Sequence, residues 1–266
     1  MNIWIERMSL RKLLMLSLGL IFILLGFELN AEPLDFAPSG ELRMGLYSGS
    51  PSSLVINPST NERVGLGYEL GLEFSKAQRL KYAPIVYPKN ADVFNAAKDG
   101  SVDLIFTNAT PVRAQSLQFS KPVVRIERGY LVSSKGTIRS AVDIDRTGVR
   151  VGVSVGSSSE TELPKILKLA TIVQTTSIAG AIGMLKNGEL DAFSTNKGIL
   201  FEMADQWAQA QVLDDVLGYE HIALGIPKAR AVDMLVVNNF IDELRRNGQL
   251  KKMIERAGLR GVKDDE

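Results

Sequence analysis

Two stretches of this chain combine a short strand with side chains that bind anions. In the first, residues 98–113, a helix ends at Gly100, an apolar run follows, and the stretch closes on Arg113. A continuous apolar run predicts a strand buried on both faces, and open α/β sheets bind ligands at the carboxyl ends of such strands. Pro111 suits the first turn of a following helix, whose free N–H groups would join Arg113 in an anion site. The candidate residues here are Asn108, Thr110 and Arg113.

A second stretch, residues 186–197, repeats this layout. It contains a helix end, Gly188, an Asp three positions later, an apolar strand and a polar run that ends in a cation. Two such units predict two similar α/β lobes, each presenting a polar strand end to a shared cleft. A chance likeness between two strand-to-helix turns is the alternative. The second unit adds the candidate ligand-binding residues Asn196 and Lys197.

Two further loops follow predicted strands. An alternating strand over residues 149–155 leads into Gly-Ser-Ser-Ser-Glu at 156–160. These hydroxyl and N–H groups could bind an anion, or they could serve only as a helix N-cap. A first strand at residues 42–47 leads into a loop rich in serine, whose hydroxyls could face a ligand or simply be exposed at the surface. The candidates from these loops are Tyr47, which could stack on a ligand, and Ser157 and Ser158.

Composition excludes several classes of function. The chain has 31 basic and 30 acidic residues, a single His and no Cys. Near-neutral charge gives no support to nucleic-acid binding or to a basic membrane-surface patch. Without Cys there are no disulfides, cysteine nucleophiles or thiolate metal sites. We therefore expect no metal, no cofactor and no nucleic-acid partner.

The amino terminus predicts secretion. Arg7, Arg11 and Lys12 precede an apolar run over residues 13–27, and Ala31 offers a small residue for cleavage. This order is typical of a secretory signal peptide, and the run is shorter than the roughly 20 residues that a membrane-spanning helix needs. We assign residues 1–31 to a signal peptide and the protein to the periplasm, with an uncleaved anchor as the alternative. Since Cys is absent, a lipid-anchored lipoprotein is excluded.

The chain resembles the extracellular solute-binding proteins of family 3, the periplasmic receptors of ABC importers for amino acids and similar solutes. The resemblance covers residues 38 to 260 and rests on the collinear order of its motifs. They are residues 40–45, 67–70, Gly100-x-x-Asp103, Thr110-x-x-Arg113, Phe119-Ser120-x-Pro122, residues 151–160 and Gly188-x-x-Asp191-Ala192.

This resemblance implies an α/β fold of the type II periplasmic-binding-protein kind. Each of its two lobes would be a mostly parallel sheet flanked by helices, and two hinge crossings would join them. The expected divisions are 38–125 for the first part of lobe 1, 126–219 for lobe 2, 220–260 for the return to lobe 1, and 261–266 for a tail. The implied function is capture of a small polar or anionic solute by a monomer, which delivers it to an inner-membrane ABC permease.

One position departs from the resembling family. Its amino-acid-binding members usually carry an Asp five residues after the position of Asp191, where it pairs with the ligand's ammonium group. This chain has Asn196 there, and a neutral amide cannot balance an ammonium charge. Asn108 likewise replaces a common Ser or Thr. The sequence therefore predicts an anionic or neutral polar ligand as readily as a standard amino acid.

An enzyme is the competing class, because periplasmic dehydratases of the cyclohexadienyl type resemble this fold. Acid–base chemistry would need a carboxylate in the cleft, and Glu160 is the one that the sequence suggests, although it could equally be a helix N-terminal charge. The string Gly-Val-Ser-Val-Gly at 152–156 matches a serine-hydrolase motif. Its Ser154 falls within a predicted strand rather than on a sharp turn, which favours coincidence. A sensor lobe of a membrane kinase is disfavoured, because nothing apolar or catalytic follows residue 260.

Overall fold

The computed structural model describes residues 37, 39–48, 50–56, 59–228 and 234–263. All of them lie in the second of the two compact units into which the chain divides, Asp35–Glu266. The predicted signal peptide, residues 1–31, lies outside the described residues.

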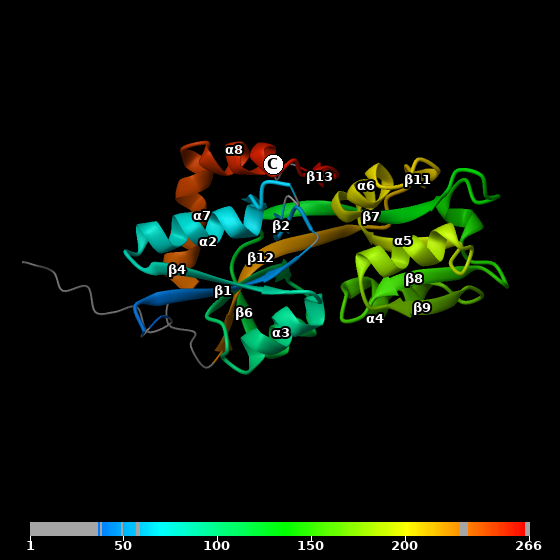
Figure 1. Ribbon diagram of the computed structural model, residues 1–266. Helices are drawn as coiled ribbons and strands as arrows, with labels where there is room; N and C mark the ends of the chain where they lie inside the picture. Colours follow the sequence, from blue (N-terminus) through cyan, green and yellow to red (C-terminus); the bar gives the residue numbers. More distant parts are fainter. Residues whose placement is uncertain (1–36, 38, 49, 57–58, 229–233, 264–266) are drawn as a thin grey trace, which may run out of the picture. The chain divides into compact units, whose positions relative to one another are not determined.

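Eleven strands of the described chain form one hydrogen-bonded sheet, in which eight follow one another along a path with β7 near its middle and three pair beside that path (Figure 1). The first half of β7 pairs antiparallel with β12, and its second half pairs antiparallel with β10. We call the strands on the β12 side the first sheet and those on the β10 side the second sheet. The first sheet contains β4 (Lys81–Tyr87), β1 (Glu41–Tyr47), β5 (Leu104–Asn108), β6 (Leu117–Phe119), β12 (Tyr219–Pro227) and part of β7 (Val124–Ser133). The second contains β10 (Ala192–Asn196), β8 (Arg150–Ser154), β9 (Thr171–Thr175), β11 (Ala210–Val212) and the rest of β7.

Each sheet has a parallel core and an antiparallel margin. Strands β4, β1 and β5 are parallel, as are β9, β8 and β10, whereas β12 and β7 run against them. The short strands β2 (Val55–Ile56) and β3 (Arg63–Val64) form a separate antiparallel ribbon, and β13 (Val262–Lys263) pairs with β7. Pro84 lies within β4, which it can occupy because β4 is an edge strand.

Helices flank both sheets. Those of the first sheet are α2 (Leu66–Ala77), α3 (Asn90–Lys98), α7 (Met234–Arg246) and α8 (Gln249–Arg256). Those of the second are α4 (Ser158–Ile166), α5 (Ile178–Lys186) and α6 (Lys197–Asp205). The sequence predicts a closing helix over residues 230–246, and the start of that range lies outside the described residues. Among the helices that the structure describes, none has the length and apolar character needed to span a membrane.

Two local predictions were wrong. No α-helix follows Pro111; the chain makes a turn there and then a single 3₁₀ turn at Arg113–Gln115. Asn90, a residue type favoured at N-caps, is predicted to cap a helix that starts at about Ala91, but the N-cap of α3 is Lys89 and Asn90 is already helical. Thr110 Oγ1 accepts from the backbone N–H of Arg113 and so supports a turn, and Lys89 rather than Asn90 has the extended backbone of an N-cap.

Alternation along β7 shows why the second sheet is buried on both faces. Tyr130 and Val132 pack in one apolar cluster with Val151, whereas Leu131 packs in another with Phe193. Successive residues of a strand point to opposite faces, so both faces of this sheet carry an apolar core.

The repeated Gly-x-x-Asp spacing has a structural role, which begins with Asp103. The backbone N–H of Arg43 in β1 donates to its Oδ2 at 2.9 Å, and Arg43 Nη2 donates to its Oδ1 at 2.6 Å. The same Nη2 also donates to the carbonyl of Gly100 at 3.0 Å. This clamp ties the start of β5 to β1. Gly100 has a positive φ of 79°, a conformation that glycine adopts without steric cost.

The second sheet repeats this clamp around Asp191. The backbone N–H of Arg150 in β8 donates to Asp191 Oδ2 at 2.8 Å, and Arg150 Nη2 donates to the carbonyl of Gly188 at 2.6 Å. Gly188 again has a positive φ, 69°. The two units predicted from the sequence therefore share their hydrogen bonds as well as their order, which argues against a chance likeness.

The two clamps should differ in strength. The Asp103 side chain is 1% exposed and that of Asp191 is 33% exposed. We expect Asp103→Ala to cost about 3 kcal/mol of unfolding free energy, because it leaves buried donors unpaired, and Asp191→Ala to cost about 1 kcal/mol, because solvent screens that pair. Urea unfolding of both variants measures the difference, and equal losses would contradict this assignment.

The Asp191 clamp should also weaken in acid. Burial alone would raise the pKa of Asp191, but the Arg150 side chain and backbone N–H donate to the carboxylate and bring its pKa below the ordinary value. A depressed carboxyl pKa stabilises the fold above its unfolded pKa, about 4, and this contribution is lost as pH falls through the folded pKa. The stability gap between the natural protein and Asp191→Ala should therefore be constant from pH 7 to pH 5 and shrink below about pH 4, as measured by urea unfolding. A gap that persists at pH 3 would contradict this.

Candidate ligand-binding site

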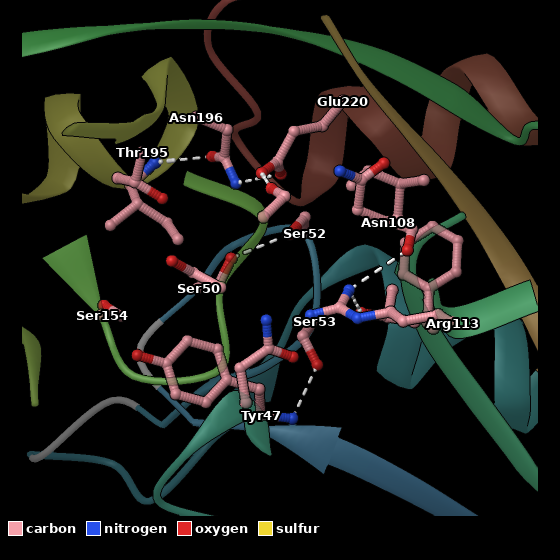
Figure 2. A pocket seen from close by; sticks show the side chains of 17 residues that line it. Tyr47, Ser50, Ser52, Ser53, Asn108, Arg113, Ser154, Thr195, Asn196 and Glu220 are labelled. Carbon is pink, nitrogen blue, oxygen red and sulfur yellow. Dashed lines mark hydrogen bonds between the residues drawn. The ribbon is translucent and has the colours of Figure 1, made fainter. Parts of the chain in front are cut away.

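A small cavity of about 50 Å³ lies where strand ends of the two sheets meet. Tyr47 at the end of β1 and Asn108 at the end of β5 line it from the first sheet, and Ser154 and Asn196 line it from β8 and β10 of the second (Figure 2). Parallel strands bring their carboxyl ends to one edge of a sheet, which explains how residues far apart in sequence converge here.

Arg113 is a buried cation of this cavity, with 6% of its surface exposed. Its Nη1 donates to Thr107 Oγ1 at 2.6 Å and to the carbonyl of Asn108 at 3.1 Å. Its Nη2 donates at 2.9 Å to the carbonyl of Gly156, which follows β8 of the second sheet. Burial lowers the pKa of the Arg113 guanidinium, and the negative charge of Glu220 partly opposes that shift. The acceptors that hold this cation within the described residues are thus neutral oxygens.

Glu220 in β12 is a buried anion of the same cavity, with 7% of its surface exposed. Ser158 Oγ donates to its Oε1 at 2.6 Å, and Asn196 Nδ2 donates to its Oε2 at 2.9 Å (Figure 2). Both donors are neutral side chains of the second sheet's elements, whereas Glu220 belongs to a strand of the first. Its two hydrogen bonds therefore span the cavity.

Sequence reasoning missed Glu220 and suggested Glu160 instead. Glu160 does not line the cavity: its Oε2 accepts from the backbone N–H of Gly156 at 2.6 Å, which is the helix N-terminal role considered as its alternative. The alternation of residues 223–226 predicts a return strand, and the structure extends that strand back to Tyr219 as β12. Glu220 lies two residues before Ile222 and four before Leu224, both of which are buried. Extending this alternation by one step towards the amino terminus would have placed Glu220 on the buried face.

The two serine-rich loops both contribute to the cavity. Ser50, Ser52 and Ser53 are buried and line it. Ser53 Oγ accepts from the backbone N–H of Tyr47 at 2.9 Å, and the hydroxyls of Ser50 and Ser52 are 2.8 Å apart. Burial raises the pKa of Tyr47, which keeps its phenol neutral.

The residues of the second loop combine capping with a place in the cavity wall. Ser157 Oγ accepts from the backbone N–H of Glu160 at 3.2 Å as the N-cap of α4, and Asn196 Oδ1 accepts from that of Ile199 at 3.1 Å as the N-cap of α6. Ser154 ends β8 and also faces the cavity, while His221, its only conceivable base, is an exposed residue of β12. The serine-hydrolase motif thus lies within a strand, as its position in the sequence indicates.

The cavity brings together six of the eight candidates from the sequence and leaves out two. Thr110 Oγ1 accepts from the backbone N–H of Arg113 at 3.3 Å and supports the turn before it. Lys197 Nζ lies 3.0 Å from Glu127 Oε2 and donates to the carbonyl of Asp214 at 2.9 Å. The six that line the cavity are Tyr47, Asn108, Arg113, Ser157, Ser158 and Asn196.

Comparison with known proteins identifies relatives of this fold and sequence. The family described as bacterial extracellular solute-binding proteins, family 3, matches residues 42–259. The chain is 27% identical over 132 residues to the glutamine-binding protein of Geobacillus stearothermophilus. That match covers 49% of this chain and only 50% of the relative.

Solved structures share the fold at low identity. A mutant of ArgBP from T. maritima superposes with a TM-score of 0.76 at 19% identity, covering 85% of this chain and 99% of the other. The ancestral amino-acid-binding protein AncCDT-1, a precursor of cyclohexadienyl dehydratase, gives 0.73 at 22% identity, covering 83% and 96%. The mixed α/β fold is thus that of the type II periplasmic binding proteins.

The ion pair of Lys197 predicts a structural role for that side chain. Replacing Lys197 by Met removes a nearly buried partner of Glu127, and we expect it to cost about 2 kcal/mol of unfolding free energy. Because Lys197 does not line the cavity, binding of a small carboxylate or amino acid found by a thermal-shift screen should change less than about twofold. Urea unfolding and titration calorimetry measure the two effects. Lost affinity with unchanged stability would contradict the prediction.

Proposed function

Because the chain belongs to the bacterial extracellular solute-binding proteins of family 3, we propose that it captures a small carboxylate-bearing solute in its cavity and delivers it to an ABC importer. The observation that carries this proposal is Arg113. The described hydrogen bonds of this buried guanidinium go to neutral oxygens, and the charge of Glu220 offsets its desolvation only in part, so a ligand carboxylate would supply a directly bonded anion. The planar fork of the guanidinium suits two parallel hydrogen bonds to one carboxylate.

Capture would proceed by closure of two lobes around the solute. The hydrogen bond from Arg113 to the Gly156 carbonyl supports this, because it joins an element of the first sheet to one of the second. In the proposal the lobes divide at residues 125/126 and 219/220, within β7 and at the start of β12. Solute that contacts both lobes favours the closed form, which the importer recognises. We further propose that the protein is a periplasmic monomer released by cleavage after residue 31.

An enzyme on this fold is the second candidate, and Glu220 is the observation in its favour. A dehydratase needs a carboxylate in the cavity for acid–base chemistry, and Glu220 provides one. The two functions differ in what happens to the ligand. A receptor returns its solute unchanged, so mass spectrometry of the small molecule recovered after prolonged incubation distinguishes them, and the appearance of a dehydrated product would favour the enzyme.

The central prediction concerns Arg113. Arg113→Ala removes the proposed partner of the ligand carboxylate and should weaken binding at least about 100-fold, since charged hydrogen bonds are the strong ones. Arg113→Lys should not restore it fully, because an ammonium group cannot form the same fork. The unfolding temperature without ligand should change little, because the variant also removes a buried charge.

Titration calorimetry with the carboxylates and amino acids that raise the melting temperature measures this loss. Arg146→Ala, at an exposed arginine paired with Asp143, serves as the control and should bind like the natural protein. Unchanged affinity in Arg113→Ala would refute the anion site.

A further inference from the structure

The carboxylate of Glu220 has two hydrogen bonds and no cation bonded to it within the described part of the chain. Its donors are the hydroxyl of Ser158 and the amide of Asn196, both neutral and both buried. A carboxylate has about four lone-pair positions that can accept hydrogen bonds. These two donors therefore orient the group and leave positions for further hydrogen bonds. The charge itself remains unneutralised in a cavity wall.

A neighbouring, mostly buried carboxylate, Glu127, is paired with cations instead. In the pairing of β12 with β7, Glu220 lies opposite Ile126, and Glu127 is the next residue along β7. Lys197 Nζ lies 3.0 Å from one oxygen of Glu127, and Lys263 Nζ lies 3.4 Å from the other. Glu127, which does not line the cavity, thus has two cationic partners. Glu220, which lines the cavity, has only neutral donors within the described residues.

We propose that Glu220 binds the ammonium group of the solute, so that the ligand is an amino acid held by its carboxylate at Arg113 and by its amine at Glu220. This inference rests on the proposed function, because it takes Arg113 as the carboxylate site. Arg113 and Glu220 line one cavity and carry opposite charges. Their side chains do not hydrogen-bond to each other, and each is instead held by neutral groups of the protein.

A zwitterion is the ligand class that neutralises both walls. A purely anionic solute would offset the charge of Arg113 but leave Glu220 buried, unpaired and repulsive. An uncharged solute would leave both charges without a partner. The cavity therefore selects for an amine and a carboxylate on the same small molecule.

Asn196 has a positioning role in this scheme. Its Oδ1 is committed to the N-cap of α6, and its Nδ2 donates to Glu220 Oε2 at 2.9 Å. From the sequence alone, a neutral Asn196 disfavours amine binding. In this scheme it instead holds in place the Glu220 carboxylate that binds the amine. Because the two side chains touch, an Asp at 196 would bring a negative charge to almost the same point.

The first experiment compares matched ligands on matched proteins. A thermal-shift screen of the natural protein against the common L-amino acids selects the best ligand, whose affinity is then measured beside that of its 2-hydroxy acid. We expect the amino acid to bind at least about 30-fold more tightly, because only it pairs with Glu220. Glu220→Gln should lose at least about 30-fold for the amino acid and nothing for the hydroxy acid.

Glu220→Gln is suitable because it keeps the shape of the side chain. The Gln amide can donate to Ser158 Oγ and accept from Asn196 Nδ2, so both hydrogen bonds survive the change. The melting temperature without ligand should therefore not fall, which separates a binding role from a structural one. Glu189→Gln, at an exposed turn residue, is the control and should bind as the natural protein does.

A charge swap tests the position of the carboxylate directly. The double variant Glu220→Gln with Asn196→Asp returns one negative charge to the same part of the wall, and we expect it to regain at least about tenfold of the lost amino-acid affinity. A structural explanation for the single variant would predict no such recovery.

The outcomes separate this inference from the function on which it rests. Retained amino-acid affinity in Glu220→Gln, equal affinity for amino and hydroxy acids, or no shift with any amino acid overturns the amine site. If carboxylates without an amine bind and Arg113→Ala abolishes that binding, the anion site stands while the amine site fails. If Arg113→Ala binds like the natural protein, the proposed function itself fails.

Discussion

The same clamp, built from an arginine, an aspartate and a glycine carbonyl, organises both sheets. In each sheet it fixes the start of one strand against a parallel neighbour, Asp103 against Arg43 and Asp191 against Arg150. The clamps thereby set the register of β5 and β10 against their neighbours. This fixes the positions of the polar residues at the carboxyl ends of the two strands. The cavity depends on this constraint, since its walls are those strand ends rather than any one continuous segment.

Strands β7 and β12 carry two glutamates that lie close together but have different partners. Glu127 on β7 is attended by Lys197 and Lys263 and serves the fold. Glu220 on β12 is attended by a hydroxyl and an amide and keeps its charge available. The same residue type, one step apart on one strand pair, is thus used for stability in one place and, in the proposal, for recognition in the other.

The sequence predicts what is local or periodic and misses what depends on distant partners. The buried strand at Leu104 and the candidate residue Arg113 follow from an apolar run and from residue chemistry; the structure has the strand and places Arg113 in the cavity wall, whereas anion binding stays a prediction. Lys197 could not be assigned from its neighbours, because its partner Glu127 lies 70 residues earlier. Glu220 lies before the apolar alternation of residues 223–226 that predicts the strand. Its position two residues before Ile222 nevertheless puts it on the buried face.

In the proposed function, the two charges without a direct ion-pair partner would also couple binding to closure. Three hydrogen bonds cross the cavity, from Arg113 to the Gly156 carbonyl and from Ser158 and Asn196 to Glu220. Forming them without a solute buries a cation and an anion that have no direct partner, which disfavours the closed form. A zwitterion removes that penalty at both ends. If the proposal holds, part of the binding free energy of a zwitterion stabilises the closed form, and a solute that lacks either charge stabilises it less.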